Sequence, residues 1–130
     1  MEYIVHRRFK TKAICGDVNL PAGTVCKLQG GMITHDGKPL CVVTSENAHQ
    51  HFARNDDGKG MERGQMIRDI INRLQKGDEL HQARWDNVWE DPLCQKYKRT
   101  EHADNWLWSH AFFNASMDDL NHIWQLVNAV

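Results

Sequence analysis

Two histidines and two aspartates near the middle of the chain have the side chains of a metal site. His49 and His51 form a His-x-His pair. Asp56 and Asp57 follow a few residues later. Imidazole nitrogens and carboxylate oxygens together suit zinc and other transition metals. A helix, however, puts residues two apart on different faces, and no second closely spaced ligand pair accompanies the histidines. The sequence therefore predicts no metal and no cofactor, and a metal-dependent enzyme using these four side chains is an alternative hypothesis.

A cysteine nucleophile is the second chemistry that the residue types permit. Cys94 is the only cysteine outside the predicted strands, and His102 follows it along the chain. A catalytic thiol needs a lowered pKa and a base within hydrogen-bond reach, and proximity in the sequence establishes neither. The chain also lacks a Gly-x-Ser-x-Gly elbow for a serine nucleophile. Because the sequence shows no complete nucleophile motif, it favours a protein that is not an enzyme.

The segment 55–60, Asn-Asp-Asp-Gly-Lys-Gly, has the composition of an ion-binding or phosphate-binding loop. Aligned as a calcium-binding loop, it places Lys59 and Met66 where hard oxygen ligands are required. It also lacks the spacing of a phosphate-binding loop and the Lys followed by Ser or Thr. The segment is therefore interpreted as a connecting loop.

Basic residues interleaved with aromatic ones occur in two places. Four cations lie close together near the N-terminus: Arg7, Arg8, Lys10 and Lys12. Phe9 lies among them, and a second basic stretch, 96–99, contains Tyr97. If the two stretches converge, their cations could follow a nucleic-acid backbone while Phe9 or Tyr97 stacks on bases. The formal net charge of −1 limits this alternative to weak, non-specific binding.

The five tryptophans are concentrated in the C-terminal part of the chain. Most are explained as anchors of a helical core, because each indole buries a large apolar area. Trp106 and Trp108 cannot both face one core, since two residues of a helix turn the chain by about 200°. One of the two is therefore predicted to lie at a groove or an interface. We expect a protein partner or self-association there, with Trp106 and Trp108 as the candidate binding residues.

Composition and charge restrict the class of protein. The chain has 130 residues, of which 41% are hydrophobic and 25% are charged, as in ordinary globular proteins. It has no apolar stretch long enough to span a membrane and no N-terminal export signal, and its four cysteines are widely spaced. We therefore expect a cytoplasmic protein with reduced thiols and no membrane contact.

Short strand patterns fill the first part of the chain. Strands are predicted at residues 3–5, 8–15, 24–29, 32–35 and 40–44. In the second of these, apolar or small residues alternate with cations, which gives the predicted strand one basic face. Residues 16–24 are interpreted as an irregular connection that ends in a Pro-x-Gly turn. Asp36-Gly37 has the composition of a two-residue hairpin turn.

Helical patterns follow residue 44. Helices are predicted over 46–53, over 61–76, from 78 up to Pro92, from about 100, and from 117 to near the C-terminus. Ser45 and Ser116 are the predicted N-caps of the first and last of these helices. The long helix from 61 carries an apolar stripe of period 3.6 and ends before Gly77. Pro92 limits the helix before it, because the residue preceding a proline is pushed out of helical geometry.

The change of period predicts an α+β fold. Residues 1–54 form a small β-sheet that resembles an SH3-like barrel in strand rhythm and turn placement, and an open meander capped by helices is the alternative. Residues 55–60 form the connecting loop. Residues 61–130 form a bundle of about four helices, which we expect to make one compact unit with the first part.

Three stretches of the chain carry a resemblance: the segment 55–60, the segment 91–99 (Asp-Pro-Leu-Cys-Gln-Lys-Tyr-Lys-Arg) and the segment 105–108 (Asn-Trp-Leu-Trp). They resemble small bacterial proteins of the kind found in prophages and mobile elements. The resemblance implies a phage-associated or accessory role and no catalytic residue. With the missing catalytic motif, it predicts a non-enzymatic binding or structural module that recognises a macromolecular partner.

Overall fold

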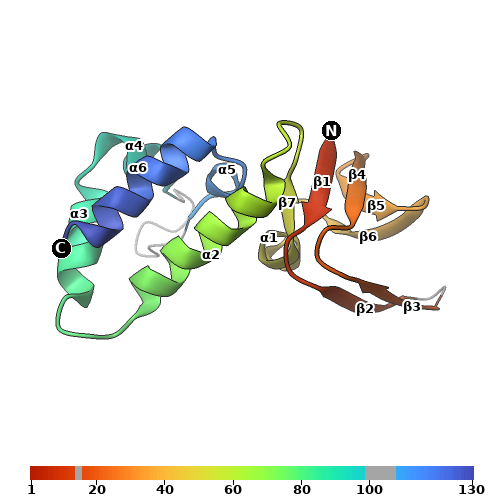
Figure 1. Ribbon diagram of the computed structural model, residues 1–130, viewed down its shortest axis with the longest axis horizontal. Helices are drawn as coiled ribbons and strands as arrows, with labels where there is room; N and C mark the ends of the chain where they lie inside the picture. Colours follow the sequence, from red (N-terminus) through yellow and green to blue (C-terminus); the bar gives the residue numbers. More distant parts are fainter. Residues whose placement is uncertain (14–15, 99–107) are drawn as a thin grey trace. The chain divides into compact units, whose positions relative to one another are not determined.

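The computed structural model describes residues 1–13, 16–98 and 108–130. Within these ranges the chain forms seven strands and six helices, so the predicted α+β class is confirmed (Figure 1). The strands are β1 (Glu2–Val5), β2 (Phe9–Ala13), β3 (Gly16–Leu20), β4 (Val25–Gln29), β5 (Met32–His35), β6 (Lys38–Val42) and β7 (Phe52–Arg54). The helices are α1 (Glu46–His51), α2 (Gly60–Gln75), α3 (His81–Trp89), α4 (Pro92–Tyr97), α5 (His110–Phe113) and α6 (Met117–Asn128).

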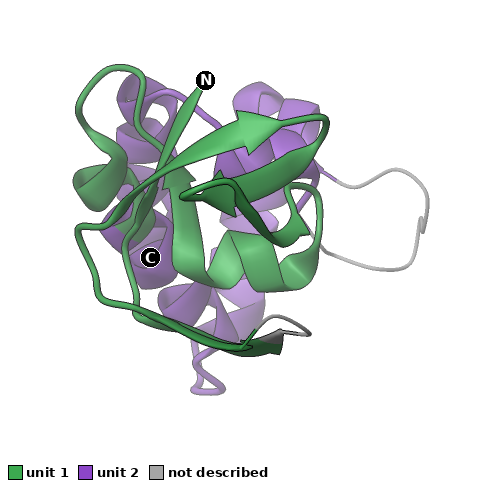
Figure 2. Ribbon diagram, turned by 90° about the vertical axis from the view of Figure 1, so that its right-hand side faces the viewer, with its two compact units in different colours: residues 1–64 green, residues 65–130 purple. Residues whose placement is uncertain are grey.

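The chain divides into two units, residues 1–64 (unit 1) and residues 65–130 (unit 2), which are coloured separately in Figure 2. Unit 1 holds an antiparallel five-stranded sheet in the order β6-β5-β4-β1-β7. A separate two-stranded ribbon, β2-β3, leaves the sheet after β1 and returns before β4. The edge strands β6 and β7 do not pair with each other in the described part of the chain, so the sheet is open and an SH3-like barrel is not confirmed.

The strand β3 corrects the prediction of an irregular connection over 16–24. Residues 16–20 pair in register with β2, with Leu20 opposite Phe9 and Asp17 opposite Lys12. The flanking Gly16 and the Pro-x-Gly turn suggest a loop, but the segment between them alternates polar and apolar residues with period two. The pairing with β2 agrees with this alternation, because it places the apolar Leu20 beside Phe9 in the core.

The strand β7 corrects the end of the helix predicted over 46–53. Ser45 caps α1 as predicted, since its hydroxyl accepts a hydrogen bond from the backbone N–H of Ala48. The helix then ends at His51, and β7 pairs with β1. Phe52 and Ala53 become buried by this pairing. A contact between segments so far apart in the sequence leaves no local signal.

The core of unit 1 lies between the sheet, the ribbon and α1. Its buried members are Tyr3, Val5, Phe9, Leu20, Cys26, Ile33, Ala48 and Phe52. The N-terminal end of α2 approaches β1 and the following residue, His6, closely, because two glycines of this helix lack side chains. A Cβ on Gly64 would lie 2.2 Å from Cγ of the buried His6, and one on Gly60 would lie 2.4 Å from Cγ2 of Ile4.

The helices of unit 2 follow the predicted pattern with two corrections. The predicted stripe of α2 is confirmed, with Ile67, Ile70 and Leu74 buried. The helix predicted from 78 begins instead at His81, and the carboxylate of Asp78 accepts from the backbone N–H of Leu80. Pro92 does not merely limit α3: it starts the additional helix α4, since its missing N–H costs nothing in a first turn.

The last part of the chain is described in part. The helix predicted from about 100 lies outside the described residues up to 107, and α5 is the helix observed after them. The helix α6 is confirmed with its cap, as the Ser116 hydroxyl accepts from the backbone N–H of Asp119. None of the helices in the described ranges has the length and apolar character needed to cross a membrane.

Candidate basic face and groove

The β2-β3 ribbon separates its cations from its apolar residues. Arg8, Lys10 and Lys12 are exposed and share one side of the ribbon, because side chains of a strand alternate between faces. Phe9 and Leu20, on the opposite side, are 1% and 8% exposed. The structure therefore brings three of the four predicted N-terminal cations onto one face, which we call the basic face. Arg7 is also exposed, on the bend between β1 and β2.

The basic face also carries polar residues from β3. Asn19 is in register with Lys10, and Asp17 is in register with Lys12. A guanidinium nitrogen of Arg8 donates to Oδ1 of Asn19 at 2.7 Å, which fixes the orientation of the arginine along the ribbon. The carboxylate of Asp17 reduces the positive potential at the end of the ribbon where Lys12 lies.

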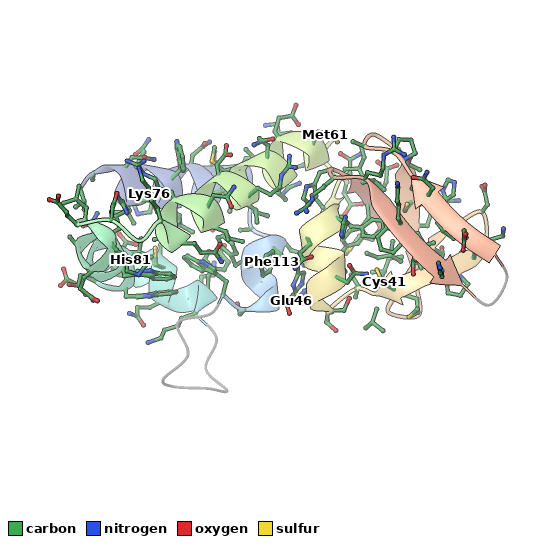
Figure 3. All side chains as sticks on the ribbon, turned by 90° about the horizontal axis from the view of Figure 1, so that it is seen from below. Cys41, Glu46, Met61, Lys76, His81 and Phe113 are labelled. Atoms are coloured by element: carbon green, nitrogen blue, oxygen red, sulfur yellow. The ribbon has the colours of Figure 1, made fainter. Side chains whose placement is uncertain are left out.

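A groove of about 180 Å³ runs beside β3 within unit 1. It is lined by the β3 residues Asp17, Val18, Asn19 and Leu20 and by His35, Asp36, Lys38 and Leu40 of the β5-β6 hairpin. The sequence does not predict this groove, because β3 itself is not predicted. Figure 3 labels Cys41 of β6, the neighbour in sequence of the lining residue Leu40.

The aromatic residues proposed to stack on bases are not available on these surfaces. Phe9 is buried in the core of unit 1. Tyr97 is 5% exposed, and its hydroxyl donates to a carboxylate oxygen of Asp119. Burial and this hydrogen bond raise the pKa of Tyr97 to about 12. Lys98 lies 5.7 Å from the ring centre of Trp89, and Arg99 lies outside the described residues.

The candidate metal ligands have other partners. Asp56 accepts from the backbone N–H of Glu2 at 2.7 Å and from Nε of Arg54 at 2.8 Å. These hydrogen bonds lower the pKa of the Asp56 carboxyl. Nδ1 of His51 lies 3.2 Å from the carbonyl oxygen of Arg7, which can only accept, so this nitrogen carries the hydrogen. His49 lies on the same helix, α1.

Asp57 belongs to a separate structural contact. It accepts from a guanidinium nitrogen of Arg63 at 2.6 Å and from the backbone N–H of Lys59 at 3.0 Å. The hydrogen bond from Arg63 is the main reason why the pKa of Asp57 lies far below its ordinary value. In the parts of the chain that the structure describes, no three His, Cys, Asp or Glu side chains come together as a metal site.

The environment of Cys94 does not suit a nucleophile. The side chain is fully buried in the core of unit 2, and burial raises the pKa of its thiol to about 12. At neutral pH the residue is therefore a protonated thiol without access to solvent. His102, its proposed base, lies outside the described residues. Cys26 is also buried, and burial raises its pKa to about 11.

The proposed interface residue Trp108 packs within unit 2. Its ring stacks on Phe112, with centroids 4.1 Å apart, and lies 4.8 Å from the ring of Trp89. The side chain is half-buried, and its backbone pairs with that of Lys98. Trp106 lies outside the described residues. An interface at these two residues therefore stays a prediction.

The comparisons with known proteins do not extend this description. No model of a protein family, no curated protein and no solved structure matches the chain. The basic face and the groove beside β3 are therefore interpreted from their geometry alone.

Proposed function

We propose that the protein is a non-enzymatic binding module and that its basic face holds the phosphate backbone of a nucleic acid. The observation that carries this proposal is the arrangement of Arg8, Lys10 and Lys12 on one exposed side of a ribbon whose other side is buried. The packing of Phe9 holds the ribbon in place, so the three cations are presented as a row. Successive cations are about 7 Å apart along the strand, since each strand residue advances about 3.4 Å.

The composition of the face indicates binding without base recognition. Phosphate contacts position a protein on nucleic acid, whereas stacking or hydrogen bonds to bases give sequence preference. Phe9 and Tyr97 are buried, so neither ring can stack on a base in this conformation. Asp17 and the net charge of −1 oppose the cations. We therefore propose weak binding that does not depend on sequence.

A salt titration tests this proposal. The full chain is titrated into a fluorescein-labelled single-stranded oligonucleotide of mixed sequence, and anisotropy is followed at several salt concentrations. Three or four phosphate contacts give a slope of log K against log salt of about −2 to −3. The double variant Lys10→Glu, Lys12→Glu is expected to weaken binding at least tenfold at low salt. The matched control is Lys27→Glu, Lys59→Glu, which changes the same charge at exposed positions of unit 1.

Two results would contradict the proposal. One is an absence of binding by the wild type at low salt. The other is an equal loss of binding in the Lys10→Glu, Lys12→Glu variant and in its control, because the binding would then depend on net charge and not on the basic face.

Three further features stay part of the proposal. An SH3-like character of unit 1 is supported by the five-strand order of its sheet and by its short turns, although the sheet is open. A phage-associated role rests on the sequence resemblance, and the genes next to the coding sequence test it. A cytoplasmic location rests on the widely spaced cysteines, and cell fractionation tests it.

A further inference from the structure

The groove beside β3 follows an unpaired strand edge. β3 pairs with β2 on one side, and no strand in the described part of the chain pairs with its other side. Four consecutive β3 residues, from Asp17 to Leu20, line the groove. Three steps of a strand cover about 10 Å, so the β3 backbone beside the groove has the length of a short extended segment. This length suits an extended chain better than a single ion.

The lining of the groove alternates in character. Val18, Leu20 and Leu40 pack against the core of unit 1 and supply apolar contacts. The charged lining residues are Asp17, Asp36 and Lys38, and Asp36 has 85% of its side chain exposed. His35 lies beside Asp36, with Nε2 3.4 Å from a carboxylate oxygen. The two carboxylates and one ammonium group give the lining a net negative charge.

We propose that the groove receives an extended segment of a partner protein, which adds to β3 as a third strand of the ribbon. Main-chain hydrogen bonds to the free edge of β3 supply affinity that does not depend on side chains. Small apolar side chains of the segment contact Val18, Leu20 and Leu40. A basic side chain between them lies near Asp17 and Asp36. This inference does not depend on nucleic-acid binding by the basic face.

A second copy of this chain fits the groove less well than a different protein. Self-association through β3 would offer the segment Gly16–Leu20 as the added strand, and this segment contains no cation for Asp17 or Asp36. A small molecule would leave the hydrogen-bonding groups along the strand edge without partners. The proposed occupant is therefore a strand that carries a basic residue.

Peptide titrations of the full, ¹⁵N-labelled chain test the inference. The probes are three capped heptapeptides in which valine alternates with lysine, serine or glutamate. The lysine peptide is expected to shift the amide signals of β3 and Leu40 and to slow hydrogen exchange in β3. Its dissociation constant is expected to be lowest, and that of the glutamate peptide highest. A lysine peptide that is N-methylated at every residue is expected not to bind, because it lacks main-chain donors.

Charge reversal provides the matched variants. Asp17→Lys, Asp36→Lys is expected to weaken the lysine peptide about fivefold or more at low salt, since one exposed ion pair contributes up to about that factor. The same variant is expected to favour the glutamate peptide. The control Glu79→Lys, Glu90→Lys changes the net charge by the same amount at exposed positions of unit 2. It is expected to leave the order of the three peptide affinities unchanged.

Several outcomes would overturn the inference. Signals of β3 that do not respond to any peptide at millimolar concentration would exclude strand addition. If the Asp17→Lys, Asp36→Lys variant binds the three peptides in the same order of affinity as the wild type, Asp17 and Asp36 do not select the peptide. Shifts of β3 signals with protein concentration alone would show that a second copy occupies the edge. Each of these results leaves the oligonucleotide titration unaffected, so the two proposals fail separately.

Discussion

At the scale of single residues, glycine decides how closely α2 approaches His6, the residue that follows β1. A Cβ at position 64 would lie 2.2 Å from the ring of His6, a distance that no packed carbon atoms show. We expect Gly64→Ala to lower the free energy of unfolding by about 1 to 3 kcal/mol, as overpacked cores do. Urea denaturation measures the change. Gly77→Ala is the control, because no atom lies within 4 Å of a Cβ there. Equal effects of the two substitutions would contradict the close contact.

The ion pair of Asp57 and Arg63 predicts a dependence of stability on pH. The guanidinium of Arg63 is 4% exposed and also donates to the carbonyl oxygen of Arg54. Because Arg63 lowers the folded-state pKa of Asp57, the carboxylate stabilises the fold above its unfolded-state pKa of about 4. This contribution is lost as the pH falls from there through the lowered folded-state value.

Chemical denaturation between pH 7 and pH 2 measures this effect. The stability difference between wild type and Asp57→Asn is expected to be constant above about pH 5 and to shrink below about pH 4. Asp118→Asn, at an exposed position, serves as the control. A difference that stays the same over the whole pH range would show that the ion pair does not stabilise the fold.

At the scale of elements, two helix N-caps of the same residue type differ in their hydrogen bonds. The hydroxyl of Ser116 accepts from the backbone of α6, whereas Ser109 precedes α5 without such a bond. The Ser109 oxygen is buried and has no hydrogen-bond partner among the residues that the structure describes. We expect Ser116→Ala to cost about 1 kcal/mol of stability and Ser109→Ala to be neutral or stabilising. Thermal melts of both variants measure this, and the reverse order would contradict it.

The stacking of Trp108 gives a second prediction for the elements of unit 2. Because its ring contacts Phe112 and Trp89, we expect Trp108→Ala to lower stability by about 2 to 4 kcal/mol and Trp108→Phe to lower it less. Denaturation measures the packing, and light scattering of the same samples measures self-association. A wild-type dimer that becomes a stable monomer in Trp108→Ala would instead place this residue at an interface.

At the scale of the whole molecule, the residues that the structure describes form two hydrophobic cores that share no residue. One contains Val5 and the other contains Leu120. All five tryptophans belong to the second part of the chain, so their fluorescence reports on unit 2. Leu120→Ala is expected to lower the stability seen by fluorescence by about 2 to 5 kcal/mol. Val5→Ala is expected to lower mainly the stability of unit 1, which is measured by the NMR amide signals of β1 and β4. If Val5→Ala lowers the stability measured by fluorescence as much as the stability measured by the amide signals, the two units unfold in one cooperative transition.

The sequence by itself determined the features that depend on neighbouring residues. The period of 3.6 in α2, the caps at Ser45 and Ser116, and the alternation in β2 are all visible locally. These features are decided by contacts within a few residues, such as a hydroxyl that reaches a backbone N–H three positions away. The α+β class and the exposure of the basic residues of β2 followed from them.

Only the tertiary structure decided the pairings and burials that join distant segments. β7 becomes a strand because β1 offers it an edge and the core accepts Phe52, although the preceding residues are helical. Phe9 and Tyr97 have the side chains of stacking residues, but the packing of their neighbours removes both from the surface. The groove exists because β3 stands beside a hairpin that is distant in sequence. These burials and pairings depend on contacts between distant segments, so the local pattern around each residue does not decide them.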